Sequence, residues 1–431
     1  MTTEGPPPRK LLVIAYYFPP MGLSGVQRTL KFVKYLPQFG WQPIILTVTP
    51  TGYYAEDITL LKELEEKEIE IVRVGSFDPN HFFRKKGLVK MPSERWAKFL
   101  GYMSDLFFIP DNKIGWRRKA FKAACDLCAK NKFDVIFATA PPFTDFLIGA
   151  DLHQKFNIPL VLDYRDPWLE YPIKHYPTPY HRWKNYVLEK SVLERTAKVI
   201  TTNRRVKELI LKQYDFLNYE DVQIIPQGFD PEDFPSQPPP PVQPSEKFVL
   251  THTGVFNGDR TPKYFLHALK KAISENPGLK GNIEARMVGN FQDGYRKLVQ
   301  SMGLENEVTI TGYLTHHESL RELAKADCLW FMLMNDRQSP GKVYEYIAAR
   351  KPILACVPEG FVRQTVLETG AGTVVKPTNV DEISQAILEL YEGHLQGRLL
   401  LPKEDIVQRY DRISLTQDLS KILGFLTESA P

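Results

Sequence analysis

Short, nearly continuous apolar runs alternate with amphipathic stretches along most of the chain. Such runs are typical of parallel strands buried on both faces, and the stretches between them suit connecting helices. The pattern therefore predicts an α/β fold with two parallel sheets, one in each half of the chain. The expected strands are Leu11–Tyr16, Pro43–Val48, Ile69–Val74, Val135–Thr139, Pro159–Tyr164, Lys198–Thr202 and Val222–Ile225, followed by Phe248–Thr253, Ile283–Val288, Val308–Thr311, Cys328–Leu333, Pro352–Val357 and Gly372–Val375.

A proline-rich stretch separates the two halves, and the length of 431 residues suits two domains of about 200 residues. We expect an N-terminal Rossmann-like domain at 1–234, with a basic and aromatic insertion at about 81–122. A stiff linker at 235–246 leads to a C-terminal Rossmann-like domain at 247–402. The last helical segment, 403–431, is expected to pack back on the first domain. Two such domains place a ligand cleft at the carboxyl ends of their strands.

Composition excludes several classes of protein. Four cysteines are too few for a disulfide framework, and the Cys125–Cys128 pair lies in a helical pattern without a second pair to complete a zinc site. No apolar run approaches the roughly 20 residues that span a bilayer. Leu11–Phe18 is short and ends at Pro19-Pro20, which favours a first strand over a signal peptide. We expect a cytoplasmic protein, at or near the inner face of the membrane.

The net charge of +4 is unevenly distributed. The segment Arg84–Lys122 holds eleven Lys or Arg and three acidic residues, with many aromatic residues among them. This combination favours an anionic partner: a membrane face, a lipid phosphate or a nucleic acid. The alternative is a solvated helical hairpin whose aromatic residues belong to the core.

The segment from Ser339 to Ala355 has the pattern of a helix that begins at a ligand. Ser339 suits the N-cap and Pro340 the first helical position, so the amides near Gly341 and the charge of Lys342 would face a phosphate. Glu345 lies one turn later on the same face, where a carboxylate accepts hydrogen bonds from a ribose diol. The alternative is a surface helix with a simple Lys342–Glu345 pair.

Three further loops follow expected strands, where α/β proteins place their ligands. Gly22 and Gly25 open the loop after the first strand, and the alternative there is an ordinary turn. Asp163–Trp168 brings Arg165, Asp166 and Trp168 to a strand end, with an internal Arg–Asp network as the alternative. A third loop opens the second half with Gly254, Arg260 and Lys263, whose two cations suit a diphosphate. Its alternative is a surface turn.

Other residues narrow the chemistry. Tyr313 follows a strand end, a position suited to lining a base pocket. His252, His316 and His317 lack metal-ligand spacing and are interpreted as structural or solvated. The absence of an Asp-x-Asp pair at a strand end argues against a divalent-metal nucleotide-sugar site, and there is no P-loop or Gly-x-Ser-x-Gly elbow. No metal and no cofactor is expected.

Taken together, five motifs in this order resemble the family-four retaining glycosyltransferases of GT-B fold, in the branch that builds bacterial surface polysaccharides and lipid-linked glycans. The matching segments are Phe18 through Gly25, Asp163–Trp168, Pro226–Asp230, Gly254–Arg260 and Lys342–Tyr346.

The resemblance implies a nucleotide-sugar donor, linked to UDP or GDP, and a saccharide or lipid-linked acceptor. Arg260 and Lys342 would stabilise the leaving diphosphate with help from Gly341, and Glu345 would hold the donor ribose. On this reading Gly25, Gly254, Lys263 and Tyr313 complete the donor side. Gly22, Arg165, Asp166 and Trp168 belong to the acceptor side, and Arg84–Lys122 contacts an anionic membrane, with no nucleic acid involved.

The chain departs from the family pattern at three places. Arg337 stands where a first Glu is usual, and Asp145 lies where many members carry a catalytic His. Lys263 follows Arg260 at a shorter spacing than usual. Two alternatives therefore stay open beside the transferase: a GT-B sugar-nucleotide epimerase, and a catalytically degenerate GT-B subunit that binds nucleotide or a partner transferase.

Overall fold

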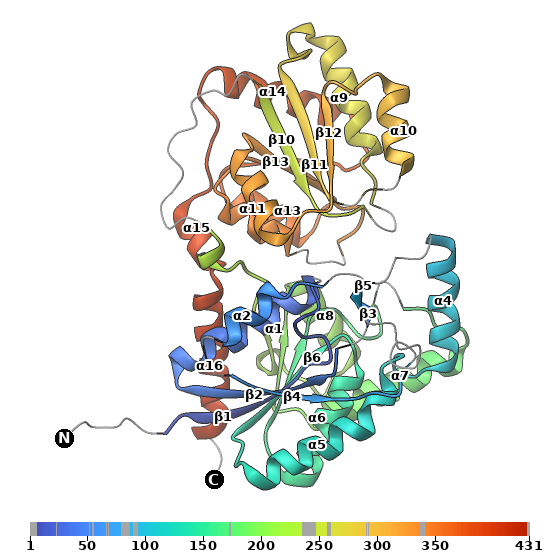
Figure 1. Cartoon of the computed structure of the whole chain (residues 1–431), viewed down its shortest axis with the longest axis vertical. Helices are drawn as coiled ribbons and strands as arrows, with labels where there is room; N and C mark the ends of the chain where they lie inside the picture. The colour runs from blue at the N-terminus through green and yellow to red at the C-terminus, as the bar shows by residue number, and fades with distance from the viewer. Residues whose placement is uncertain are drawn as a thin grey trace, which may run out of the picture. The chain divides into compact units, whose positions relative to one another are not determined.

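The computed structural model divides into two compact units, Met1–Pro226 with Leu415–Pro431, and Gln227–Ser414 (Figure 1). The residues that it describes are 7–22, 24–50, 52–53, 56–65, 67, 69–78, 87–88, 94–171, 174–234, 247–256, 260–289, 291, 293–336 and 341–428.

Unit 1 is built on a seven-stranded parallel sheet in the order β4-β2-β1-β6-β7-β8-β9. Nearly every residue of the central strands is buried, as expected for a sheet covered on both faces. Its strands are β1 (Arg9–Ile14), β2 (Trp41–Val48), β4 (Glu70–Val74), β6 (Val135–Ala140), β7 (Leu160–Tyr164), β8 (Lys198–Thr201) and β9 (Val222–Ile224), and a separate two-stranded sheet pairs β3 (Gly52–Tyr53) with β5 (Gly87–Leu88).

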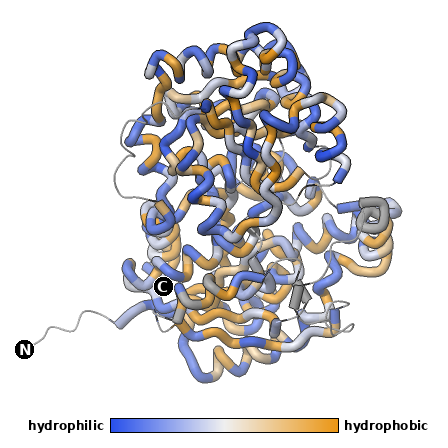
Figure 2. The backbone as a smooth tube through the Cα atoms, turned by 45° about the horizontal axis from the view of Figure 1, so that its top comes forward, coloured by the Kyte–Doolittle hydropathy of each residue, from blue (hydrophilic) through white to orange (hydrophobic). Residues whose placement is uncertain are grey.

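Successive residues of β1 point to opposite faces and join different cores. Leu12 and Ile14 pack with α5, α6 and α7, whereas Leu11 and Val13 pack with α1, α2 and α16. The helix tubes alternate between hydrophobic and hydrophilic residues, which marks one buried and one exposed face (Figure 2). The helices of unit 1 are α1 (Ser24–Tyr35), α2 (Thr59–Glu65), α4 (Glu94–Phe107), α5 (Arg117–Lys130), α6 (Thr144–Phe156), α7 (Pro179–Leu193), α8 (Arg204–Gln213) and the part of α16 (Arg412–Glu428) that follows Ser414.

Helix α16 brings the end of the chain to the core beneath β1 and β2. Leu415, Leu419 and Leu423 are buried in that core, and the indole Nε1 of Trp41 donates to Ser420 Oγ at 3.3 Å. These contacts make unit 1 discontinuous in sequence.

Unit 2 repeats the same plan with a six-stranded parallel sheet in the order β12-β11-β10-β13-β14-β15. Helices α9, α10 and α14 pack on one face, and α11, α12, α13 and α15 on the other. The strands are β10 (Phe248–Thr253), β11 (Ile283–Val288), β12 (Val308–Gly312), β13 (Cys328–Met332), β14 (Ile353–Cys356) and β15 (Gly372–Val375). The helices are α9 (Lys263–Glu275), α10 (Asp293–Met302), α11 (His316–Lys325), α12 (Lys342–Ala348), α13 (Phe361–Glu368), α14 (Val380–Leu395) and α15 (Glu404–Arg409).

The sequence prediction of two parallel α/β sheets is confirmed, and each expected strand overlaps an observed one. The unit boundary falls at Pro226 instead of 234, because Phe229 pairs with the chain near Tyr410 and Arg412 inside unit 2. The expected linker at 235–246 lies outside the described residues, and the expected last segment forms two helices, α15 and α16. In the described part of the chain, no helix is long and apolar enough to cross a bilayer.

A buried carboxyl lies inside unit 1. Glu189, on α7, is almost fully buried, and its Oε2 accepts a hydrogen bond from the hydroxyl of Tyr214 at 2.9 Å. Burial raises the pKa of Glu189 to about 8, although the Tyr214 hydroxyl favours the charged form. The folded protein therefore holds this carboxyl protonated at neutral pH.

We predict that this proton makes stability pH-dependent. The folded state keeps the proton up to about pH 8, whereas the unfolded chain loses it near the ordinary pKa of 4.5, so stability falls as pH rises between these values. Relative to Glu189→Gln, the wild type should lose about 1.4 kcal/mol of unfolding free energy per pH unit in this window. Denaturant unfolding at three pH values measures it. The exposed Glu194→Gln is the control, and parallel curves for wild type and Glu189→Gln would contradict the prediction.

Candidate functional site

Each sheet has a switch point, where the connections that follow two neighbouring strands run to opposite sides of the sheet. In unit 1, β1 lies between β2 and β6, and in unit 2, β10 lies between β11 and β13. Loops that follow such neighbouring strands diverge at the carboxyl edge and leave a crevice, which is where open α/β sheets bind ligands. The predicted site residues follow these strands, so each unit is described from its own switch point.

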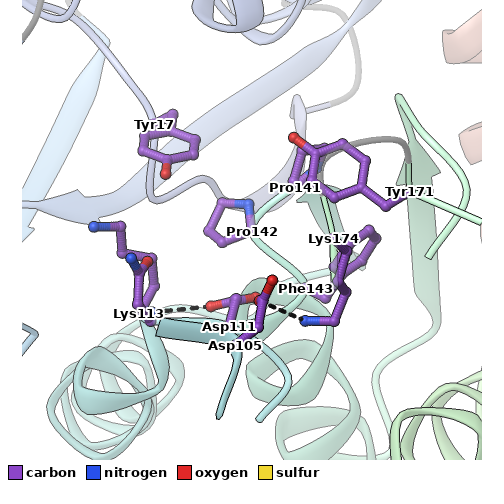
Figure 3. A pocket seen from close by; sticks show the side chains of 10 residues that line it. Tyr17, Asp105, Asp111, Lys113, Pro141, Pro142, Phe143, Tyr171 and Lys174 are labelled. Atoms are coloured by element: carbon purple, nitrogen blue, oxygen red, sulfur yellow. Dashed lines mark hydrogen bonds and ion pairs between the residues drawn. The ribbon is translucent and has the colours of Figure 1, made fainter. Parts of the chain in front are cut away.

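The switch point of unit 1 opens into a cavity of about 150 Å³ (Figure 3). Tyr17 lines it from the loop after β1, and Pro141–Phe143 line it from the loop after β6. Tyr171 adds a second phenol to the lining. Lys174 and Asp105 also line the cavity, and they form an ion pair at 3.5 Å. Aromatic faces beside paired charges suit a polar, hydroxyl-bearing ligand. The sequence analysis did not single out these lining residues.

Arg165 fastens the loops around this cavity together. Its guanidinium donates to the backbone carbonyls of Gly25 and Pro141, and Nε donates to Ala140 O at 3.3 Å. A Cβ on Gly25 would come within 2.9 Å of Arg165 Nη1, so a larger residue there would shift the guanidinium. Arg165 was expected on the acceptor side. Because its donors are used by loop carbonyls, we assign it a positioning role.

The other polar residues of this box also form an internal network. Asp163 is fully buried and pairs with Arg28, whose Nη2 donates to Oδ1 at 2.8 Å, while Thr139 Oγ1 donates to Oδ2 at 2.9 Å. The alternative reading of an Arg–Asp network therefore describes this part of the loop.

Trp168 was expected to face the acceptor, but its side chain is completely buried. The ring stacks on Phe143 with centroids 4.7 Å apart, and Nε1 donates to Asn185 Oδ1 at 2.9 Å. It therefore supports the cavity wall from behind. Of the remaining acceptor-side residues, Asp166 is half-buried, and burial raises its pKa against the opposing charge of Arg165. Gly22 lies near Asp57, whose Cβ is 3.1 Å from the position of an added Cβ.

Asp145 was expected to take the place of a catalytic His. It lies in the first turn of α6 with no exposed surface, and Oδ2 accepts a hydrogen bond from Tyr16 N at 2.8 Å. Among the described residues Oδ1 has no partner. Burial raises the pKa well above its usual range, against the lowering effect of the Tyr16 amide, so the uncharged form is favoured. Asp145 is not among the residues that line the cavity, and its hydrogen bond to Tyr16 N places it behind the loop after β1.

The carboxyl edge of unit 2 is built on three glycines. Gly254 and Gly289 follow β10 and β11, and Gly312 is the last residue of β12, with φ values of +134°, +149° and +85° respectively. Gly254 N donates to Val288 O at 2.9 Å, and Gly289 N donates to Gly312 O at 3.0 Å. A Cβ on Gly289 would overlap the Gly254 carbonyl oxygen. The sequence analysis identified Gly254 but not Gly289, which no local motif marks.

Lys342 and Glu345 lie on one face of α12, and Lys342 Nζ is 2.8 Å from Glu345 Oε2. The sequence analysis gave a simple Lys342–Glu345 pair as the alternative to a ligand site, and this pair is present. Both charged residues lie in the first turn of the helix. The helix begins at Lys342 with Gly341 as N-cap, whereas the expected cap Ser339 and first residue Pro340 lie outside the described residues.

Tyr346 joins α12 to the end of β10 through a hydrogen bond. Its hydroxyl accepts a hydrogen bond from Thr253 N at 2.8 Å, and the side chain is fully buried. The loop that begins at Gly254 and the face that carries Lys342 are thereby fixed to each other within unit 2.

His252 has a role that the sequence analysis missed. Its Nδ1 is 3.0 Å from Trp330 O, which only accepts, so Nδ1 carries the proton and Nε2 has a lone pair. Nε2 is buried without a partner among the described residues. Burial, together with the positive charges of Arg260 and Lys342, lowers the pKa of His252 to about 4, against the raising effect of the hydrogen bond to Trp330 O. Arg260 and Lys342 therefore both act on this imidazole, which stays neutral.

His316 is a second missed residue. Its Nε2 lies 3.0 Å from Asp233 Oδ2. Burial opposes its charge, but the bond to Asp233 and the charge of Glu345 outweigh burial and the repulsion from Lys342, so the pKa is raised. His316 thus has its charged form favoured and lies within electrostatic reach of the Lys342–Glu345 pair.

The other predicted donor residues lie nearer the surface. Tyr313 directly follows β12 and is exposed, and Lys263 is exposed at the start of α9. Arg260 is half-buried, whereas residues 257–259 and Arg337 lie outside the described residues. Among the described residues, no group of three or more His, Cys, Asp or Glu side chains is arranged to hold a metal ion.

Family models match both units. One described as Glycosyltransferase Family 4 matches residues 24–233, and one described as Glycosyl transferases group 1 matches residues 233–399. This protein is a glycosyltransferase. No curated protein matches this chain in sequence.

Solved structures similar to the glycosyltransferase confirm the GT-B fold. Anabaena HepE, in complex with UDP and glucose, is 17% identical with a TM-score of 0.62, covering 97% of this chain and 100% of HepE. WaaG, a glycosyltransferase involved in lipopolysaccharide biosynthesis, is 14% identical with a TM-score of 0.60, covering 96% of this chain and 99% of WaaG. A putative UDP-N-acetylglucosamine 2-epimerase from Listeria monocytogenes is 11% identical with a TM-score of 0.58, covering 98% of both chains.

We predict that Gly289→Ala destabilises the donor-side glycine cluster. The new methyl group would overlap Gly254 O and would force an L-residue to a φ of +149°, which together cost about 2–4 kcal/mol. Denaturant unfolding measures the loss. Gly294→Ala is the control, since Gly294 lies in α10 with nothing within 4 Å of an added Cβ and should be neutral or stabilising by up to about 1 kcal/mol. Equal stability of the two variants would contradict this account of the close approach.

Proposed function

We propose that this glycosyltransferase moves a sugar from a nucleotide-sugar donor to a saccharide or lipid-linked acceptor, with retention of configuration and without a metal ion. The observation that carries the proposal is the cationic group of unit 2, in which Lys342 is held by Glu345 and acts together with Arg260 on the neutral His252. The donor base is proposed to be uracil or guanine. UDP bound to HepE supports the first.

Departure of a nucleoside diphosphate builds negative charge on the β-phosphate. Cations placed before the reaction lower this barrier, because they interact more strongly with the transition state than with the intact donor. Lys342 and Arg260 supply that charge, and the neutral state of His252 keeps a third cation from repelling them. In this arrangement the charge that a metal would supply comes from side chains.

In this proposal, Glu345 accepts hydrogen bonds from the hydroxyl groups of the donor ribose. In the structure its carboxylate is bound to Lys342, so donor binding exchanges part of that ion pair for hydrogen bonds to the ribose hydroxyls and frees Lys342 for phosphate. His316, whose charged form is favoured by its bond to Asp233, lies within electrostatic reach of Glu345 during this exchange.

The acceptor is proposed to bind in the cavity of unit 1, between Tyr17 and Tyr171. Retention would follow from attack of the acceptor hydroxyl on the face that the diphosphate leaves, which requires no protein nucleophile. The pathway is proposed to be assembly of a surface polysaccharide or lipid-linked glycan, which the likeness to WaaG supports.

The test of the donor site is binding of nucleoside diphosphates and their sugar conjugates in the presence of EDTA. A ligand at a hundred times its Kd should add about 2.7 kcal/mol of stability, which a melting experiment detects. Lys342→Ala should weaken binding at least about tenfold and reduce turnover by about 10²–10³. The control is Lys325→Ala, because Lys325 forms a similar pair with Glu322 at 2.6 Å on α11. Equal losses in both variants would contradict the assignment.

The same experiment separates the two alternatives. An epimerase would convert the donor without any acceptor, and a degenerate subunit would bind nucleotide without turnover. The Listeria structure favours testing the first, and Arg337 and Asp145, where the family pattern carries Glu and His, favour testing the second. With an acceptor panel, NMR of the product anomer tests retention.

We further propose that unit 1 contacts an anionic membrane. The expected segment Arg84–Lys122 divides in the structure: Lys113 and Trp116 are buried, whereas α4 exposes Phe99, Leu100, Tyr102 and Phe107. Residues 84–86 and 89–93 lie outside the described residues.

Helix α7 continues this exposed surface. Its Tyr180 and Trp183 are exposed with ring centroids 5.8 Å apart, and His181 Nε2 donates to Leu106 O on α4 at 3.1 Å. Aromatic side chains among basic residues are typical of a membrane-interface surface.

Phe107→Ser combined with Trp183→Ser should reduce co-sedimentation with vesicles of anionic lipid by about tenfold or more, because each ring loses apolar burial. Binding of the wild type should also weaken as salt screens the anionic surface. Tyr219→Ser, which removes another exposed ring of unit 1, is the control. Binding that neither salt nor the double substitution changes would contradict membrane contact.

A further inference from the structure

A second cavity, of about 280 Å³, lies inside unit 2. It is lined by the end of α12 and the turn that follows it, by α11, and by Asp233 and Phe234. Helix α12 has seven residues and is therefore about 10 Å long, with Lys342 at its first position and Ala348 at its last. The cavity thus lies at the end of α12 opposite to Lys342 and Glu345.

Lys351 is the unusual residue of this cavity. The side chain lines it, yet the residue is only 4% exposed. Among the described residues, none gives its ammonium group a hydrogen bond or an ion pair, and the carboxylate of Asp327 acts on it only at longer range. Burial lowers the pKa of Lys351, because partial desolvation disfavours the charged ammonium group, and the carboxylate of Asp327 opposes this effect.

The other charges of the cavity differ in whether they are paired. Arg350 is bound by both oxygens of Glu404, at 2.9 and 2.8 Å, and Asp233 is bound by His316. Arg321 lines the cavity from the exposed side of α11, and the described residues give it no hydrogen bond or ion pair. Within the described part of the chain, Lys351 and Arg321 therefore bring positive charge to the cavity without an ion pair or hydrogen bond of their own, and the carboxylates of Asp327 and Glu318 act on them only electrostatically.

Charge and lining together define the ligand. An ammonium and a guanidinium are the groups that bind phosphate, whereas Leu320, Ala324, Ala348 and Ala349 supply a small apolar wall. The volume is at the lower end of the range for small-molecule sites, so the ligand is compact.

We propose that this cavity is a second anion site, which binds the phosphate of a small phosphorylated molecule, such as a monosaccharide phosphate, apart from the donor position. The phosphate contacts Lys351 and Arg321, and the carbon skeleton lies against the alanines. The ligand also lies beside Asp233, which holds His316, so an occupied cavity is connected to the charge that acts on Glu345.

The test uses the whole chain with two probes, inorganic phosphate and glucose 6-phosphate, followed by calorimetric titration. Glucose 6-phosphate should bind saturably, and Lys351→Met should weaken it at least tenfold. Lys342→Ala should leave it within about twofold of the wild type. Tighter binding of the sugar phosphate than of phosphate identifies a metabolite site, and equal binding of the two identifies a site for phosphate alone.

Two further variants guard against misfolding. Lys351→Met removes a buried charge and keeps the chain length, so its melting temperature should stay the same or rise. Arg321→Gln changes an exposed residue and should weaken binding about threefold to tenfold, whereas Arg296→Gln on α10 should not. The proposal is overturned if neither probe binds the wild type, or if binding is lost in Lys342→Ala and kept in Lys351→Met. The second result would assign the anion to the donor position and leave the proposed function intact.

Discussion

The buried ion pair of Arg28 and Asp163 is the interaction on which the first unit depends. Both side chains are almost entirely removed from solvent, and three hydrogen bonds join them. Arg28 Nη1 also donates to Pro226 O at 2.6 Å, and Asp163 accepts from Thr139. One pair thereby connects α1, β6, β7 and the last residue before unit 2. Such a pair stabilises only when every donor and acceptor is satisfied, because each buried ion costs several kcal/mol of desolvation.

Arg165 extends this network to the loops. Its guanidinium donates to the carbonyls of Gly25 and Pro141 and so holds the loops after β1 and β6 together. These donors are used within the protein and are not directed at a ligand. The cavity beside them is then lined by tyrosines and by paired charges such as Lys174 and Asp105. Walls of balanced charge suit an uncharged hydroxyl group, in contrast to the two cations, Arg260 and Lys342, that act on His252 in unit 2.

Sequence alone predicted the strands well, because continuous apolarity is a local property that sheet burial imposes directly. It also placed Lys342 and Glu345 on one face, since helical spacing is local too. It failed where partners are distant: nothing near Arg28 reveals Asp163, 135 residues later. The same holds for His252, whose neutral state arises from burial and from Arg260 and Lys342. Trp168 was misjudged because an aromatic residue at a strand end suits a ligand site and a core equally.

The position of α16 has a consequence for the order in which the protein folds. Leu415, Leu419 and Leu423 complete a core whose other members precede Pro226. During synthesis from the N-terminus, all of unit 2 leaves the ribosome before those leucines do. The second unit can therefore fold while the first still exposes an apolar face beside β1 and β2. Until α16 emerges and covers this face, its apolar side chains stay exposed, which is the kind of surface that chaperones protect.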